Sequence, residues 1–285
     1  MRGMDRTTAS SRIGATLCLL ALALPACGSG RSANGPTVPS TQPAAPSGAW
    51  MLVFNDDFDS DGPPDASKWG YELGYIRNNE AQYYTSRPEN ARVEGGMLVI
   101  EGRKEEYRGY SYTSASLNTL GKFEFTYGRV EVRAKLPTGN GAWPAIWMLG
   151  VNRTQVGWPT CGEIDIMENV GFDPRRIHGS VHTAAYNHTI QTQKTASVTV
   201  SDPWSDFHTY AMEWHADRIE VSVDGQVYFT FRNEQTGART WPFDKPQYLL
   251  LNFAIGGGWG GQKGIDETRF PQKYLIDYVR IYQQK

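Results

Sequence analysis

Apolar and polar residues alternate in short segments along most of the chain from Trp50 onward. Residues 129–136 place aliphatic side chains at every second position between charged ones, which is the period of a half-buried strand. Residues 218–231 predict a hairpin, because two such runs flank the turn dipeptide Asp224-Gly225. A short apolar run at 97–100 predicts another strand, and residues 248–253 and 274–282 complete the set of predicted strands.

Glycine, proline and asparagine punctuate the gaps between these segments, and the sequence shows neither a long helical heptad pattern nor an internal repeat. Many short strands joined in this way are typical of an antiparallel sandwich. We therefore expect an all-β fold, a two-sheet antiparallel β-sandwich of the jelly-roll type, that forms a single domain over residues 50–285.

One predicted strand carries three acidic residues, Glu163, Asp165 and Glu168. Glu163 and Asp165 alternate with two isoleucines, so their carboxylates share one face of the strand. Glu168 follows Glu163 by an odd number of residues and belongs to the opposite face of a regular strand. One extra residue, a β-bulge near Met167, returns Glu168 to the face of the other two acids.

Three carboxylates on one face repel one another and lower stability, which argues against a purely structural role for them. Two carboxylates whose pKa values are pushed apart can act as nucleophile and general acid at a glycosidic bond. We therefore interpret this strand as the candidate catalytic element.

The composition directs attention to sugars as ligands. The 285 residues include 9 Trp and 15 Tyr. Core packing accounts for about half of the tryptophans, and the flat indole faces of the rest match the apolar face of a pyranose ring. The net charge is -2, and no basic stripe is present, which argues against a nucleic-acid partner.

Two segments before the acidic strand combine aromatic and polar side chains. Trp143 and Trp147 share a face if residues 141–147 are extended, and they either stack on adjacent sugar rings or cap an edge of the core. Residues 78–84, which include Asn79, are dense in hydrogen-bonding groups. This segment is either a loop that recognises hydroxyl groups or a solvated turn.

Two segments after the acidic strand are also candidates. His178 and His182 share one face of a predicted strand, so one of them contacts the acids or they are core histidines. The glycine-rich loop 256–261 carries Trp259. A glycine loop can bind phosphate, but that interpretation is weak here because neither a Lys-Ser/Thr pair nor a helix start follows.

The N-terminal region has the pattern of an export signal over residues 1–27, with three arginines before an apolar run too short to span a bilayer. Its end at Cys27 is typical of a bacterial lipoprotein, in which this cysteine is lipidated; ordinary secretion is the alternative. Residues 28–49 are rich in Gly, Ser, Pro and Ala and predict a disordered linker. We therefore expect an exported protein that contacts a bacterial envelope membrane only through Cys27.

The cysteines predict no disulfide in the folded domain. Cys18 and Cys27 lie in the predicted signal, which leaves Cys161 alone. A nucleophilic thiol needs a base partner, and the sequence offers none nearby, so we interpret Cys161 as a small buried apolar residue.

Together these segments resemble family 16 of the glycoside hydrolases and, within it, the laminarinase-like endo-β-1,3-glucanases. The resemblance runs through nearly all of residues 50–285 and includes the six-residue Glu-x-Asp-x-x-Glu string. It implies a jelly roll with a substrate cleft on its concave sheet. It also implies that Glu163 is the nucleophile, Glu168 the acid/base, and Asp165 the partner that orients and tunes Glu163.

The resemblance implies further sites. The positions expected in the cleft are Asn79, Trp143, Trp147, His182 and Trp259. Catalysis needs no cofactor, but a structural calcium ion is expected on the convex side, at Asp57, the backbone of Gly96, and Asp277, because oxygen ligands suit this ion. Ser116 and Leu120 depart from the basic residues of many relatives, which leaves subsite contacts and linkage preference open.

These observations predict a monomeric, endo-acting enzyme that hydrolyses β-1,3-glucan by a retaining double displacement. The predicted cleft segments contain few Lys or Arg residues, which favours a neutral glucan over a sulfated galactan. The alternatives are a mixed-linkage β-1,3-1,4-glucanase, another family 16 polysaccharide hydrolase, a transglycosylase, and a non-catalytic carbohydrate-binding sandwich.

Overall fold

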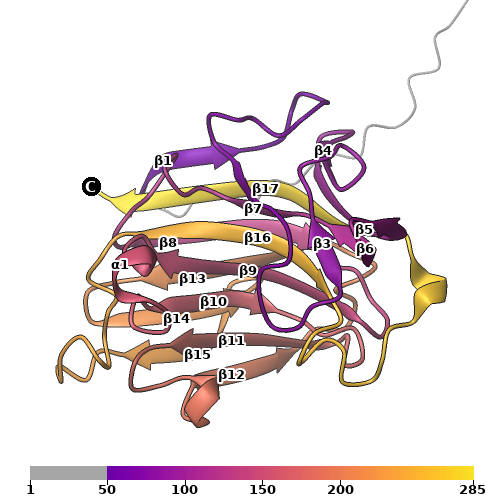
Figure 1. Cartoon of the computed structure of the whole chain (residues 1–285). Helices are drawn as coiled ribbons and strands as arrows, with labels where there is room; N and C mark the ends of the chain where they lie inside the picture. The colour runs from indigo at the N-terminus through magenta and orange to yellow at the C-terminus, as the bar shows by residue number, and fades with distance from the viewer. Residues whose placement is uncertain (1–49) are drawn as a thin grey trace, which may run out of the picture. The chain divides into compact units, whose positions relative to one another are not determined.

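The computed structural model describes residues 50–285, which are coloured in Figure 1. The predicted signal, the predicted linker and Cys27 lie outside the described residues. Between residues 50 and 285, no helix is both long enough and apolar enough to cross a membrane.

Two largely antiparallel sheets form the domain, as the pattern of alternation predicted. The ten-stranded sheet contains β1 (Trp50–Asp56), β3 (Gln82–Tyr84), β4 (Ala91–Val93), β5 (Leu98–Tyr107), β6 (Tyr110–Ser114), β8 (Gly128–Lys135), β13 (His208–Trp214), β14 (Arg218–Val223), β15 (Gln226–Arg232) and β17 (Gln272–Gln284). The seven-stranded sheet contains β2 (Gly70–Glu72), β7 (Ser116–Asn118), β9 (Ala142–Gly150), β10 (Glu163–Glu168), β11 (Arg176–His182), β12 (Lys194–Thr199) and β16 (Gln247–Ile255).

The seven-stranded sheet has the order β12-β11-β10-β9-β16-β7-β2, so the acidic strand β10 lies inside the sheet rather than at an edge. Figure 1 shows this sheet in front of β8, β13, β14 and β15. Helical structure in the described residues is limited to single turns, at α1 (Arg153–Val156), η1 (His188–Ile190) and η2 (Glu267–Arg269).

The core lies between the sheets, where the apolar positions of the alternating strands meet. Ile146, Ile164 and Leu251 of the seven-stranded sheet and Val132 and Val279 of the ten-stranded sheet are all fully buried there. Burying a side chain of this size contributes about 1.5–3 kcal/mol. With one face of β9, β10 and β16 held by the core, the side chains on their other face are available to form a site.

The predicted hairpin is confirmed as β14 and β15. Asp224 and Gly225 both have positive φ angles, 50° and 82°, which is the requirement of a type I′ turn between antiparallel strands. The predicted role of Cys161 is also confirmed. Its side chain is 1% exposed, and burial raises the pKa of its thiol to about 11, so the thiol stays protonated at neutral pH.

Candidate active site

The bulge predicted in the acidic strand is present in β10. Relative to β9, the register shifts between Asp165 and Met167, and relative to β11 it shifts between Asp165 and Glu168. The consecutive residues Ile166 and Met167 are both fully buried in the core between the sheets. Because two neighbouring side chains point inward, Glu168 returns to the outer face that Glu163 already occupies.

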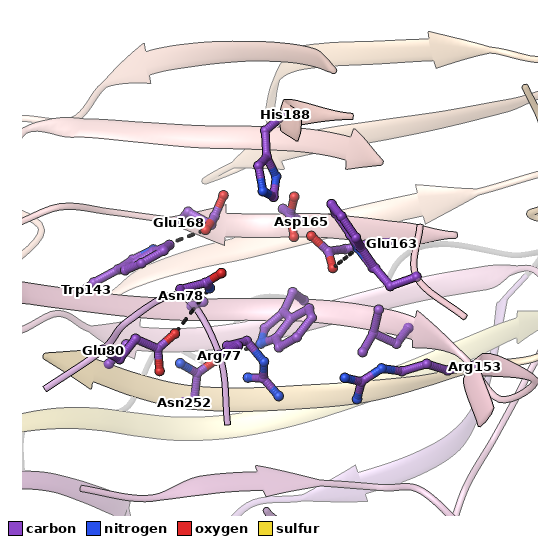
Figure 2. Close-up of a pocket in the computed structure, with 15 residues that line it drawn as sticks. Arg77, Asn78, Glu80, Trp143, Arg153, Glu163, Asp165, Glu168, His188 and Asn252 are labelled. Atoms are coloured by element: carbon purple, nitrogen blue, oxygen red, sulfur yellow. Dashed lines mark hydrogen bonds between the residues drawn. The ribbon is translucent and has the colours of Figure 1, made fainter. Parts of the chain in front are cut away.

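The three acids lie on the floor of an open cleft of about 230 Å³ on the outer face of the seven-stranded sheet. Figure 2 shows the three carboxyl groups in a row along β10, with Trp143 beside Glu168. β9 and β16 complete the floor, and loop residues around Asn78 and Trp158 contribute to the walls. The inner face of these strands is the core, so the cleft has a rigid base.

Each acid has a different neighbour. Trp158 donates its Nε1–H to Glu163 Oε2 at 2.9 Å, and Trp143 donates its Nε1–H to Glu168 Oε1 at 3.1 Å. His182 Nε2 lies 3.3 Å from Asp165 Oδ2 and 3.7 Å from Glu163 Oε1. The two outer carboxyl groups are therefore each oriented by an indole, and the histidine lies against Asp165 and Glu163.

The trio is strongly perturbed in its titration. Burial raises the pKa of Glu163 and of Glu168 to about 8, and the charge of Asp165 adds to both shifts. Burial also raises the pKa of Asp165 to about 8. Because the charges interact, the protons belong to the set rather than to single residues, and at neutral pH the set retains protons that isolated carboxyl groups would lose.

This perturbation predicts a pH-dependent gain in stability for Glu168→Gln. A raised folded-state pKa contributes stability that is fully present below the unfolded pKa of 4.5 and is lost as pH rises toward 8. The neutral amide never ionises and keeps an oxygen that accepts from Trp143. The variant should melt at least about 2 °C above the wild type at pH 8–9 and close to it at pH 4–5. Thermal melts across this range measure the difference, and a gap independent of pH would contradict the assignment.

Of the residues predicted to bind sugar, Trp143 lines the cleft, and so does Trp147. Its stacking on a sugar ring stays a prediction, and only 7% of this residue is exposed. The guanidinium of Arg77 lies over its ring, 4.9 Å from the centroid, in a cation–π contact. At this point the cleft therefore presents Arg77, which is paired with Glu72, rather than an open indole face.

The sugar-binding roles of Asn79 and Trp259 stay predictions, because neither residue belongs to the cleft lining itself. Asn78 lines the cleft, whereas Asn79 does not, and Asn79 Oδ1 accepts a hydrogen bond from Tyr75 at 3.1 Å. Both asparagines have positive φ angles, so the strand alternation that would assign their directions does not apply. Trp259 is absent from the lining as well. It packs edge-on against Trp143, with ring centroids 5.6 Å apart, and so supports that indole.

The histidine alternatives resolve in favour of His182, which contacts the acids, while His178 packs against Trp259 at 5.0 Å. Sequence reasoning missed Trp158 and His188, whose rings lie 5.0 Å apart at the cleft. The available indication for Trp158 was an indole five residues before Glu163 in a segment leading into the strand.

The expectation of a cleft poor in basic residues is corrected, because Arg77 and Arg153 both line it. Neither lies in a strand of the floor: one is in the loop before β3, the other in α1. Ser116, where many relatives were expected to have a basic residue, is buried and donates to Glu72 Oε2 at 2.7 Å. Glu72 thus connects Ser116 to the arginine that covers Trp147.

The positions expected to bind calcium offer oxygen ligands, but both carboxylates already have cationic partners. Asp57 Oδ1 accepts from Arg280 at 2.7 Å, and Asp277 Oδ2 accepts from Arg133 at 2.6 Å. Gly96 belongs to the turn that precedes β5. The donors are chemically suitable, but the arrangement fits a bound calcium only if an arginine is displaced.

Comparison with known proteins gives concordant matches. The model for glycosyl hydrolases family 16 matches residues 78–280. A beta-glucanase of Rhodothermus marinus is 51% identical over 244 residues, or 82% of this chain and 85% of that protein. The X-ray structure of the laminarinase from Rhodothermus marinus has a TM-score of 0.81 at 50% identity and covers 83% of this chain and 98% of that one.

A second solved structure, of a non-specific endo-β-1,3(4)-glucanase from the same family, has a TM-score of 0.81 at 51% identity and covers 86% of this chain and 95% of that one. The family model and these relatives each span most of the domain that carries the cleft and the acidic strand. The resemblance predicted from the sequence is confirmed, and the chain belongs to family 16 of the glycosyl hydrolases.

Proposed function

We propose that this protein is an endo-acting, retaining glycoside hydrolase that cleaves β-1,3-glucan of the laminarin type. The observation that carries the proposal is the convergence of Glu163, Asp165 and Glu168 on the floor of one open cleft. An open cleft admits the middle of a polymer chain, which suits endo cleavage. The relatives named as a beta-glucanase and a laminarinase support the substrate.

In the proposed mechanism, a carboxylate oxygen of Glu163 attacks the anomeric carbon while the bond from that carbon to the leaving oxygen breaks. Glu168, protonated because its pKa is raised, gives its proton to the leaving oxygen. Water then attacks the glycosyl-enzyme, Glu168 takes its proton, and the ester to Glu163 is released. Asp165 is a positioning residue. Its carboxylate places negative charge beside Glu163, and it contacts His182, which also lies against the nucleophile.

The roles differ because the surroundings of the two glutamates differ. Glu163 has two stabilising neighbours for its anion, the Trp158 N–H and His182. Glu168 has the Trp143 N–H, and among the described residues it makes no ion-pair contact with His182. The carboxylate with more support is the better resident anion, which assigns it the nucleophilic role.

A specific observation favours cleavage of mixed β-1,3(4) linkages as the second candidate. The similar structure named as a non-specific endo-β-1,3(4)-glucanase is as close in TM-score as the laminarinase. Arg77, which lies over Trp147 in the cleft, is held by Glu72, and Glu72 in turn accepts from the buried Ser116, so the residue at position 116 influences this part of the cleft indirectly.

Hydrolysis of a polysaccharide panel tests the proposed function. We expect the fastest release of reducing ends from laminarin, slower release from mixed-linkage glucan, and none from carrageenan. Proton NMR of the first product should show the β-anomer, because two displacements restore the configuration. An initial α-anomer would exclude Glu163 as a nucleophile. A lack of hydrolysis together with binding would leave only a carbohydrate-binding sandwich.

Calcium is proposed only as a stabilising ion. A calcium titration followed by thermal melting should raise Tm if the ion replaces Arg133 at Asp277, and Asp277→Asn should abolish that rise. A Tm that does not change across the titration would mean that the two arginines, rather than a metal, neutralise these carboxylates. Neither result affects the catalytic proposal, which routes no step through a metal.

Export, lipid attachment at Cys27 and a monomeric state are proposed from the sequence alone. The signal pattern over residues 1–27 and the linker composition over residues 28–49 support the first two. An anchored enzyme of this kind would act on glucan outside the cell, where a polymer can reach the cleft.

A further inference from the structure

Two bulges face each other across the core, and only one of them lies in the acidic strand. In the hairpin of the ten-stranded sheet, Val221 pairs with Phe229 and Ser222 pairs with Val227, which leaves Tyr228 as the extra residue. This bulge turns Tyr228 out of the alternation of β15 and packs it against the core between the sheets.

The hydroxyl of Tyr228 reaches the bulge in β10. Its Oη lies 3.5 Å from the carbonyl oxygen of Ile166 in the other sheet, at the long end of hydrogen-bond distances. A bulge interrupts the ladder of backbone hydrogen bonds, so peptide groups beside it need other partners. The carbonyl that Tyr228 contacts belongs to one of the two bulge residues that separate Asp165 from Glu168.

Gly179 supplies the space for this contact. Asp165 pairs with Ser180 and Glu168 with His178, so Gly179 is the single residue of β11 opposite the two bulge residues. A Cβ atom at position 179 would lie 2.8 Å from Tyr228 Oη and 3.3 Å from its Cζ. Gly179 does not have a positive φ angle, so the space for the hydroxyl, rather than backbone conformation, accounts for glycine here.

We infer that Tyr228 is a positioning residue for the acid/base: its hydroxyl supports the β10 bulge and thereby directs Glu168 toward the leaving oxygen. Glu163 and Asp165 precede the bulge and pair regularly with β9 and β11, so they do not depend on this support. Glu168 follows the bulge, so its direction depends on this support. The inference rests on the proposed role of Glu168.

A comparison of leaving groups tests the inference, because only a poor leaving group needs the acid. Tyr228→Phe should lower kcat/KM on laminarin about three- to tenfold, the scale of one lost hydrogen bond. On dinitrophenyl β-laminaribioside, whose leaving group departs without a proton, kcat/KM should change less than about twofold. Tyr274→Phe is the matched control, because Tyr274 Oη is buried without a hydrogen-bond partner among residues 50–285. It should behave as wild type on both substrates.

A second variant, in β11, disturbs the contact between Tyr228 and Ile166 by crowding the tyrosine hydroxyl. Gly179→Ala should push the hydroxyl away from Ile166 and reproduce the selective loss on laminarin. In the Tyr228→Phe background the same alanine should cost less, because the atom it crowds most is gone. Additive effects, equal losses on both substrates, or wild-type rates in Tyr228→Phe would overturn the inference. Glu168→Ala, assayed alongside, distinguishes failure of the proposed function from failure of the inference about Tyr228. If Glu168→Ala keeps its laminarin activity, the proposed role of Glu168 is wrong, independently of the result for Tyr228.

Discussion

Replacement of either outer acid with alanine should abolish cleavage of laminarin and leave the fold intact. Glu163→Ala removes the atom that forms the covalent bond, and we expect kcat to fall about 10⁴-fold or more. Glu168→Ala removes the proton donor, and we expect a fall of about 10²–10⁴-fold. Both side chains lie on the cleft face of β10, while the core-facing residues Ile164 and Ile166 are unchanged, so the circular dichroism spectrum should be that of the wild type.

Azide distinguishes the two roles in these variants. With an activated aryl substrate, azide takes the place of the missing nucleophile in Glu163→Ala and gives the α-glycosyl azide by one inversion. In Glu168→Ala, azide attacks the glycosyl-enzyme and gives the β-glycosyl azide by two. Product NMR reads the anomer directly. The reverse pattern would exchange the roles of the two glutamates, and wild-type rates in either variant would remove that residue from the mechanism.

Replacement of Asp165 with asparagine should have the second largest effect, with a distinctive pH signature. The charge of Asp165 adds to the pKa shifts of both glutamates, so the neutral amide lowers the pKa of Glu168. The alkaline limb of the activity profile reports loss of the acid's proton, so it should move to lower pH by about one unit. At the wild-type optimum we expect kcat to fall about 10²-fold, mainly because the nucleophile loses its positioning neighbour. The one-unit shift of the acid's pKa accounts for at most about tenfold, and it does so only on the alkaline side of the optimum.

The pH–rate profile of kcat on laminarin, compared with the wild type, measures both effects. Asp217→Asn, at an exposed carboxyl group between β13 and β14, is the control for a change of charge alone and should leave the profile unchanged. An alkaline limb that stays in place or moves to higher pH in Asp165→Asn would contradict the electrostatic coupling of the trio.

The sheets could be predicted from the sequence because their determinants are local. A run of alternating apolar and polar residues indicates which side chains share a face of the strand. The turn dipeptide Asp224-Gly225 supplies the positive φ angles that a tight hairpin needs. The bulge in β10 could be predicted as well. Three acids are useful together only on one face, and the odd spacing of Glu168 permits that only with an extra residue.

The sequence by itself therefore determined the strands, the face that carries the acids, and the chemistry that the acids support. Only the tertiary structure decided which groups surround them: Arg77 over Trp147, Trp158 against Glu163, Asn78 rather than Asn79 in the cleft, and Tyr228 beneath the bulge. Periodicity assigns a side chain to a face of its own strand. It carries no information on which loop or opposite strand, distant in the chain, packs against that face, because those contacts depend on the register and curvature of the whole sandwich.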